Sequence, residues 1–222
     1  ESLLCDLKAL ELEQQIGEKG NVPNALNSVG VAYSILGDSQ RALEYFKRSA
    51  EAPQLRPASV EREVRVSGNI ANIYLEHGDL QRAREIWTQL AILVEKNKDK
   101  DQVPPMLGLA QIAREEGKFA EAIDLFMRAL ATDEAMKVKN RGRDQFILRR
   151  LAEVHLASGN NEETIRYSDL AIEKLKIIGF ADLKWEPLVY KARANMNMGR
   201  LKAARADLEE AIQVIEAMRS RS

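Results

Sequence analysis

Cysteine, histidine and aromatic residues are scarce in this sequence. Its 222 residues include one cysteine, two histidines and 5% aromatic residues. The single Cys5 excludes an internal disulfide and fits a reducing compartment, so we expect a cytoplasmic protein. Without closely spaced Cys and His ligands a zinc site is not expected, and we predict neither a metal nor a cofactor.

Long hydrophobic runs and an excess of charge of one sign are also missing. No apolar stretch reaches the roughly 18 residues that a membrane helix needs, so no membrane partner is expected. The 33 basic and 34 acidic residues give a net charge of −1, which favours no contact with nucleic acid. The basic run KVKNRGR, residues 137–143, is interpreted as a solvated loop. A chain that is 45% hydrophobic and 30% charged is typical of a helical globular protein.

One glycine recurs along the chain at a nearly constant interval. It lies in the similar phrases ILGDSQRA and EHGDLQRA and in three more divergent ones, as Gly37, Gly78, Gly117, Gly159 and Gly199. Successive positions differ by 41, 39, 42 and 40 residues. A period in this range predicts an array of stacked supersecondary units.

Each unit has the pattern of two helices joined at this glycine. Apolar and small residues recur at three- and four-residue spacing on both sides of Gly37, as at Leu26, Val29 and Tyr33 before it and Ala42 and Phe46 after it. The glycine suits the left-handed residue that ends a helix. Asp38 and Asp79 follow the glycine and are expected to cap the second helix. So short a turn predicts antiparallel packing.

These residues resemble the tetratricopeptide repeat, whose pattern asks for a large residue, Leu-Gly, Tyr, Ala and an aromatic residue. The first unit supplies Leu26, Val29-Gly30, Tyr33, Ala42 and Phe46. Units four and five drift, with His155 and Asn195 at the tyrosine position. The resemblance implies an all-α fold, a right-handed superhelical solenoid of about five antiparallel helix pairs preceded by a single helix.

The expected boundaries make residues 1–222 a single solenoid. Residues 1–20 form a lone helix of a truncated repeat, and the hairpins cover 23–52, 59–97, 103–138, 144–178 and 183–220. The orphan helix indicates that more repeats precede it and that the chain is a slice of a larger protein. The long repeat is similar to kinesin-light-chain-like repeats and to the repeat regions of bacterial proteins with a caspase-like CHAT protease domain, to which the closing AIQVIEAMRSRS also points.

The candidates for catalysis lie in separate units. Cys5, His77 and His155 are several helices apart, and neighbouring helices are spaced by about 8–10 Å, so a catalytic dyad is not expected. Cys5 is interpreted as a small buried residue, His77 as a helix cap and His155 as a core residue with one satisfied ring nitrogen. The sequence therefore predicts a protein without enzymatic activity.

The resemblance implies that the first helix of each unit lines a peptide-binding groove. Carried over by position, the groove residues are Asn24, Asn27, Val31, Arg65, Asn69, Asn72, Gln111, Arg114, Arg149, Glu153, Arg193 and Asn197. Carboxamides such as Asn27, Asn72 and Gln111 can both donate to and accept from a peptide backbone. The leading hypothesis is a scaffold that binds a protein or peptide segment and regulates a neighbouring domain, as in a CHAT-type protease. The alternative is a structural spacer or a homo-oligomer that self-associates through its terminal helix faces.

Overall fold

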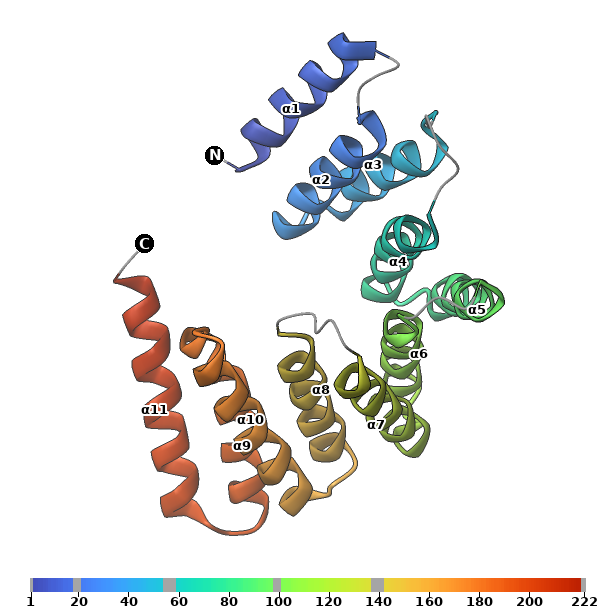
Figure 1. Ribbon diagram of the computed structural model, residues 1–222. Coiled ribbons are helices and arrows are strands. Elements are labelled where there is room, and N and C mark those ends of the chain that lie inside the picture. Colours follow the sequence, from blue (N-terminus) through green and yellow to red (C-terminus); the bar gives the residue numbers. More distant parts are fainter. Residues whose placement is uncertain (1, 18–20, 54–58, 98–100, 137–141, 221–222) are drawn as a thin grey trace. The chain divides into compact units, whose positions relative to one another are not determined.

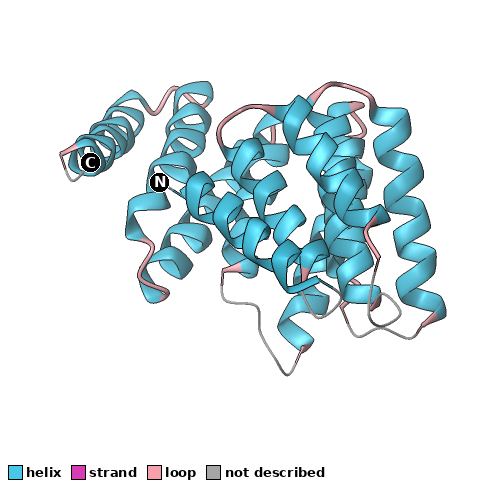
Figure 2. Ribbon diagram, turned by 90° about the horizontal axis from the view of Figure 1, so that it is seen from above, coloured by secondary structure: helices cyan, strands magenta, loops and turns pink. Residues whose placement is uncertain are grey.

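The computed structural model describes residues 2–17, 21–53, 59–97, 101–136 and 142–220. Within these ranges the chain forms eleven α-helices and one short 3₁₀ helix, and Figure 2 shows them joined by loops without a strand. The all-α prediction is therefore confirmed. The chain divides into two compact units, Glu1–Gly108 and Leu109–Ser222, and each is described by itself. Most of the basic run KVKNRGR, residues 137–141, lies outside the described part.

Unit 1 contains a single helix followed by two antiparallel helix pairs and the first turns of α6 (Figure 1). Its helices are α1 (Ser2–Ile16), α2 (Val22–Ile35), α3 (Ser39–Glu51), α4 (Val60–Glu76), α5 (Leu80–Lys96) and the beginning of α6 (Val103–Glu115). Helix α2 packs on α3, α4 packs on α5, and α1 packs on α2.

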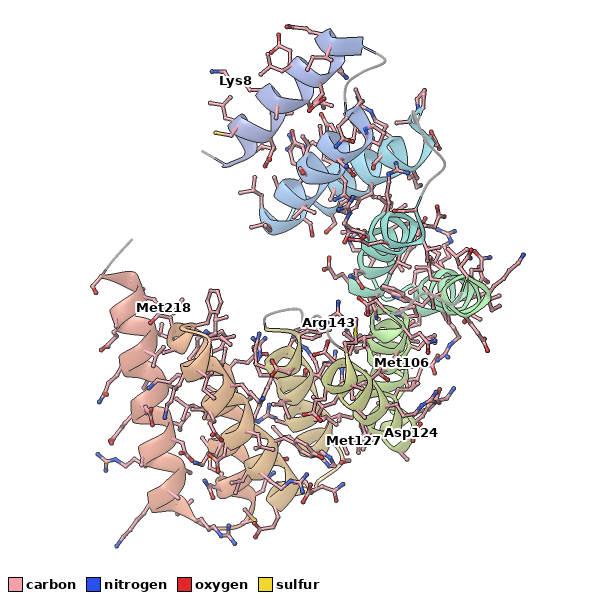
Figure 3. All side chains as sticks on the ribbon, viewed as in Figure 1. Lys8, Met106, Asp124, Met127, Arg143 and Met218 are labelled. Carbon is pink, nitrogen blue, oxygen red and sulfur yellow. The ribbon has the colours of Figure 1, made fainter. Side chains whose placement is uncertain are left out.

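Unit 2 continues from the second half of α6 with two further pairs, α8 with α9 and α10 with α11. Its helices are α7 (Phe119–Ala135), α8 (Arg143–Ala157), α9 (Asn161–Ile177), η2 (Ala181–Lys184), α10 (Trp185–Asn197) and α11 (Leu201–Arg219). Helix α10 packs against both α9 and α8. The ion pair between Arg143 and Asp133, 3.3 Å long, joins the start of α8 to the end of α7, and Figure 3 labels Arg143 there.

The repeated glycine ends the first helix of each pair, as predicted. At Gly37 and Gly78 the backbone φ is 78° and 75°, a left-handed conformation that costs little without a Cβ atom. Asp38 and Asp79 begin the next helix, and each side chain accepts a hydrogen bond from the backbone N–H three residues later. The short turn therefore satisfies polar groups at both helix ends.

Small residues allow the two helices of a pair to approach closely. Ala42, Ala71 and Ala152 are fully buried. A Cβ atom on Gly30 would lie 2.6 Å from the ring of Phe46, so only glycine leaves space for that ring. Close packing of this kind makes a larger residue at these positions destabilising.

One expectation about α1 is wrong. Cys5 is exposed, because α1 packs on α2 with the side that carries Leu3, Leu7 and Leu10 and Cys5 lies off that side. Figure 3 shows Lys8 on the side of α1 that points away from α2. Across the described ranges, no helix is long and apolar enough to cross a membrane.

Candidate functional site

The groove residues predicted from the sequence fall on the first helices of the pairs in both units. We define the first-helix face of unit 1 by Asn24, Asn27, Val31, Arg65, Asn69 and Asn72 on α2 and α4. We define the first-helix face of unit 2 by Gln111, Arg114, Arg149, Glu153, Arg193 and Asn197 on α6, α8 and α10.

On the first-helix face of unit 1, carboxamides connect α2 to α4. Asn69 Nδ2 donates to Asn27 Oδ1 at 3.0 Å, and Arg65 Nη2 donates to Asn24 Oδ1 at 2.6 Å. Asn24 Nδ2 in turn donates to Asn21 Oδ1 at 3.0 Å. Asn27 is buried, and Asn24 and Asn69 are half-buried. The predicted residues of these two helices are thus brought together in pairs.

These pairs leave several hydrogen-bonding groups of the face unused. Asn27 Nδ2 and Asn69 Oδ1 have no partner among the described residues, and neither atom is sealed from solvent. Asn72 is half-buried and lies one turn beyond Asn69. Its side chain makes no hydrogen bond within the described ranges. The carboxamides of the face therefore offer both free donors and free acceptors, all uncharged.

Apolar side chains continue the face toward the end of α2. Val31 is 37% exposed, and Ile35, one turn further along, is 80% exposed. The structure does not join Val31 by any contact to the carboxamide pairs. A polar strip beside exposed aliphatic groups can accommodate both the backbone and the side chains of a bound segment.

The first-helix face of unit 2 is built differently, from ion pairs between helices. Glu153 Oε2 on α8 lies 2.5 Å from Arg114 Nη1 on α6 and 2.6 Å from Arg150 Nη1 on its own helix. Arg114 also pairs with its neighbour Glu115. The side chains of Arg114 and Glu153 are 18% and 27% exposed, so water screens these charges only in part.

A second carboxylate, Glu186, extends the network to α10. Its Oε2 lies 2.5 Å from Arg149 Nη2, and the Arg149 side chain is only 12% exposed. The hydroxyl of Tyr190 donates to Glu186 Oε1 at 2.7 Å. Arg150 Nη2 approaches the same oxygen at 4.0 Å. We refer to Arg114, Arg149, Arg150, Glu153, Glu186 and Tyr190 as the ion network.

Two members of the ion network, Tyr190 and Arg114, have shifted pKa values. Burial raises the pKa of Tyr190 far above its usual range, and the hydrogen bond to Glu186 raises it further. Burial lowers the pKa of Arg114, but Glu115 and Glu153 more than offset this effect and leave that pKa raised. Tyr190 therefore stays protonated and acts as a hydrogen-bond donor, and Arg114 stays charged.

Three predicted residues of unit 2 stay outside the ion network. Gln111 is half-buried and Arg193 is exposed. The side chain of neither residue forms a hydrogen bond or ion pair with a described residue. Asn197 Nδ2 donates to Asn161 Oδ1 at 3.0 Å, which joins the end of α10 to the start of α9.

Half of the ion network was not predicted from the sequence, namely Arg150, Glu186 and Tyr190. The signal was present in helical spacing, because Arg150 and Glu153 are three residues apart and Glu186 and Tyr190 are four apart. What the spacing could not give is the contact between Arg149 and Glu186, which lie on different helices.

The three candidates for catalysis lie on different helices. Cys5 and His77 are exposed on α1 and at the end of α4, and His155 is buried on α8. The predicted hydrogen bond of His155 is not formed: its ring stacks on Tyr167 at 5.3 Å, and Nδ1 has no partner among described residues. No cluster of His, Cys, Asp and Glu in the described ranges could hold a metal ion.

Family comparisons identify repeats in both halves of the chain. Two tetratricopeptide-repeat family models match it, one at residues 62–135 and the other at residues 23–54 and 189–217. No curated protein sequence matches the chain.

Solved structures of similar fold share little sequence with this chain. BtubC (BKLC) from P. vanneervenii superposes with a TM-score of 0.78 at 14% identity, covering 98% of this chain and 91% of that one. A putative kinesin light chain from P. anserina with nearly identical tetratricopeptide-like repeats gives 0.62 at 17% identity, covering 90% and 97%. A Rap protein in complex with Competence and Sporulation Factor gives 0.77 at 11% identity, covering 91% and 55%.

Proposed function

Because this chain is a tetratricopeptide-repeat array, we propose that it is a non-enzymatic scaffold that binds a protein or peptide segment. We place the binding site on the first-helix face of unit 1. The observation that carries this proposal is the hydrogen-bonded pair of Asn69 and Asn27, which leaves one carboxamide donor and one carboxamide acceptor unused side by side on α2 and α4.

A peptide backbone is the complement of such a pair. Each peptide group has one donor and one acceptor, so Asn27 Nδ2 can donate to a carbonyl while Asn69 Oδ1 accepts from an N–H. Asn72, one turn further along α4, supplies a second carboxamide for the next peptide group. Recognition of this kind depends on the backbone more than on side chains, and it suits an extended segment.

The first-helix face of unit 2 is the weaker candidate. Its charged groups already satisfy one another in the ion network, and a ligand would have to separate Arg149 from Glu186 before it could bind either. Separating a partly buried ion pair leaves charges uncompensated and is unfavourable. Arg193 and Gln111, which have no such partners, are the groups of this face that a ligand could reach.

Structures of similar fold support a binding role. The Rap protein was crystallised with Competence and Sporulation Factor bound. Another similar structure, 17% identical with a TM-score of 0.77 and covering 96% of this chain and 32% of that one, is a Signal Transduction ATPase from Pyrococcus horikoshii with a tetratricopeptide-repeat sensor.

A peptide library displayed to the purified chain tests the proposal. We expect selected peptides whose binding is lost in the Asn69→Ala and Asn72→Ala variants and retained in Arg193→Ala, the matched control on the first-helix face of unit 2. Replacing the bound peptide's backbone N–H groups by N-methyl groups should also abolish binding. Selection of no peptide, or equal binding by all variants, would refute the proposal.

We further propose that the array serves a larger multidomain bacterial protein, such as a CHAT-type caspase-like protease, in the cytoplasm. The length of the repeat supports the multidomain context, and the single cysteine supports the cytoplasm as the compartment. The sequence of the full reading frame on both sides of these residues tests this proposal. A downstream domain with a catalytic His and Cys is expected, and its absence contradicts the protease context.

A second candidate function is that of a structural spacer or self-association module. Exposed large apolar side chains on α1 and α11 favour it, among them Leu12 at 59% and Ile212 at 53% exposure. Repeat arrays need their terminal faces covered. Light scattering across a range of concentrations tests this candidate, and a strict monomer would rule self-association out.

A further inference from the structure

One stripe of α4 carries charges of opposite sign at its two ends. We define the α4 stripe by Arg65, Asn69, Asn72 and Glu76, which are four, three and four residues apart. This spacing keeps side chains on one face of a helix. Arg65 and Glu76 are exposed, and the two carboxamides between them are half-buried. The first-helix face of unit 1 therefore has a positive end, a neutral middle and, at the last residue of α4, a negative end.

Neither charge of the α4 stripe is neutralised by a neighbour. Arg65 Nη2 donates to Asn24 Oδ1 at 2.6 Å, and its other guanidinium nitrogens have no partner among the described residues. Glu61 lies one turn before Arg65 on the same helix, but the two side chains form no ion pair. The carboxylate of Glu76 has neither a hydrogen bond nor an ion pair within the described ranges. Both charges are thus available to a ligand.

The backbone dipoles have the same polarity as the α4 stripe. Glu76 lies in the last turn of α4, which contains no basic residue, and the partial negative charge of a helix C-terminus makes a carboxylate there unfavourable. A cationic group of a ligand would offset this repulsion. At the other end, Asn24 is the third residue of α2 and contacts Arg65. The partial positive charge at the start of α2 therefore adds to the charge of Arg65.

The distance between the two charges fits a short extended segment. Glu76 follows Arg65 by eleven residues, which is about 16 Å along a helix. An extended chain covers that distance in about five residues. Asn69 and Asn72 lie between the charges, so the backbone of the segment can bond to the carboxamides while groups at its two ends reach Arg65 and Glu76.

We propose that the first-helix face of unit 1 binds a dipolar segment of about six residues, with an anionic group against Arg65 and a cationic group against Glu76. This inference rests on the proposed peptide-binding function and adds the length and the charge order of the ligand. The shared chemistry is one carboxylate and one ammonium or guanidinium group. These groups can come from side chains, or from the free C-terminus and N-terminus of a short peptide.

Peptide pools that differ only in the order of their charges test the proposal. Each pool has acetylated and amidated ends and the same randomised middle positions. One pool begins with Asp and carries Lys five residues later, a second has these two residues exchanged, and a third has Gln at both positions. We expect the purified chain to retain one charged pool about fivefold more strongly than the neutral pool, as two exposed ion pairs allow. At about 1 M NaCl, where charges are screened beyond about 3 Å, this preference should disappear.

A pool of six-residue neutral peptides with free ends identifies the source of the charges. Retention about fivefold above that of the capped neutral pool would support a short free peptide as the ligand. Retention equal to that of the capped neutral pool, together with a preference for one charged pool, would support charged side chains within a longer segment.

A charge swap on the chain provides the decisive comparison. The double variant Arg65→Glu, Glu76→Lys should prefer the charged pool that the unmodified chain rejects. Glu63→Lys is the matched control, because Glu63 is exposed on the opposite side of α4, and its preference should be unchanged. Equal retention of all capped pools, or the same preference before and after the swap, overturns the charge order but leaves peptide binding in place. Retention of no pool refutes the peptide-binding proposal and this inference together.

Discussion

The two units are built from the same helical hairpin, but the side-chain contacts that join their first helices differ. In unit 1, α2 and α4 are joined by neutral carboxamides and one guanidinium, in the pairs Asn27–Asn69 and Asn24–Arg65. In unit 2, α6, α8 and α10 are joined by short ion pairs around Glu153 and Glu186. Equivalent positions thus carry free hydrogen-bonding groups in one unit and mutually neutralised charges in the other.

This difference is the basis on which we propose that binding and stability are assigned to different units of the repeat array. Neutral carboxamides can exchange water for a peptide group at little electrostatic cost. Partly buried charges cannot be parted without a large penalty. We therefore assign ligand recognition to the first-helix face of unit 1, and to the ion network the role of holding the first helices of unit 2 together.

Removal of Glu186 should have the largest effect on stability. Glu186→Ala leaves Arg149, whose side chain is 12% exposed, without its carboxylate and leaves the Tyr190 hydroxyl without its acceptor. We expect the free energy of unfolding, measured in urea, to fall by about 2–3 kcal/mol. Glu209→Ala on α11 is the control, because its pair with Arg205 is exposed and its loss should leave stability unchanged.

The two units also differ in how their second helices begin. Asp79 of unit 1 accepts a hydrogen bond from Arg82 N at 3.1 Å, whereas Arg200, at the same position before α11, makes no side-chain cap. Asp79→Ala should lower the unfolding free energy by about 1 kcal/mol. Arg200→Asp gains a cap but loses the exposed ion pair of Arg200 with Glu162, 2.7 Å long, so we expect no net change. Thermal and urea unfolding check both values, and an Asp79→Ala variant of unchanged stability would contradict the capping role.

The hydrogen bond between carboxamides in unit 1 should contribute little to stability. Asn69→Ala removes the bond to Asn27 Oδ1, and water can replace it, so we expect a loss of about 0.5–1 kcal/mol. Arg193→Ala in unit 2 should cost nothing measurable. If Asn69→Ala destabilises the chain as much as Glu186→Ala does, the carboxamide pair is structural and the division of roles between the units fails.

The last prediction concerns the pH dependence of stability and a residue of unit 2, His155. Burial lowers the pKa of His155 below its ordinary value of 6.5, although Glu163 opposes the shift. As pH falls, His155 of the unfolded chain therefore takes up its proton at a higher pH than His155 of the folded chain. The stability that neutral His155 contributes is complete above pH 6.5 and is lost as pH falls through the lowered pKa. Substitution of His155 by Tyr, the residue of the repeat pattern, should reduce the slope of the unfolding free energy against pH. The reduction is at most about 1.4 kcal/mol per pH unit. An unchanged slope in His155→Tyr, measured by urea unfolding between about pH 7.5 and 5.5, would contradict this assignment.

The repeat was predictable from the sequence because it is local. A left-handed glycine, a capping aspartate and small residues at fixed spacing act within one hairpin, and Gly37, Asp38 and Ala42 behave as predicted. The same local signals define the helices that carry the candidate groove residues.

Contacts between hairpins could not be predicted from spacing. Arg149 and Glu186 are 37 residues apart, and only the packing of α8 against α10 makes them partners. The exposure of Cys5 also depends on packing between helices. Helix α1 is covered by α2 on one side, and Cys5 does not lie on that side. The resemblance assigned the candidate residues to the first helices of the pairs, where they lie, but it could not show which of their groups are already paired.

The most direct test of the division between the units is two-dimensional NMR of the side-chain carboxamide groups during titration with a selected peptide. We expect the Nδ2 resonances of Asn27, Asn69 and Asn72 to shift together and saturate at one affinity, while that of Asn197 in unit 2 stays in place. Shifts confined to Asn197 and Gln111, with the unit 1 resonances unchanged, would contradict this division.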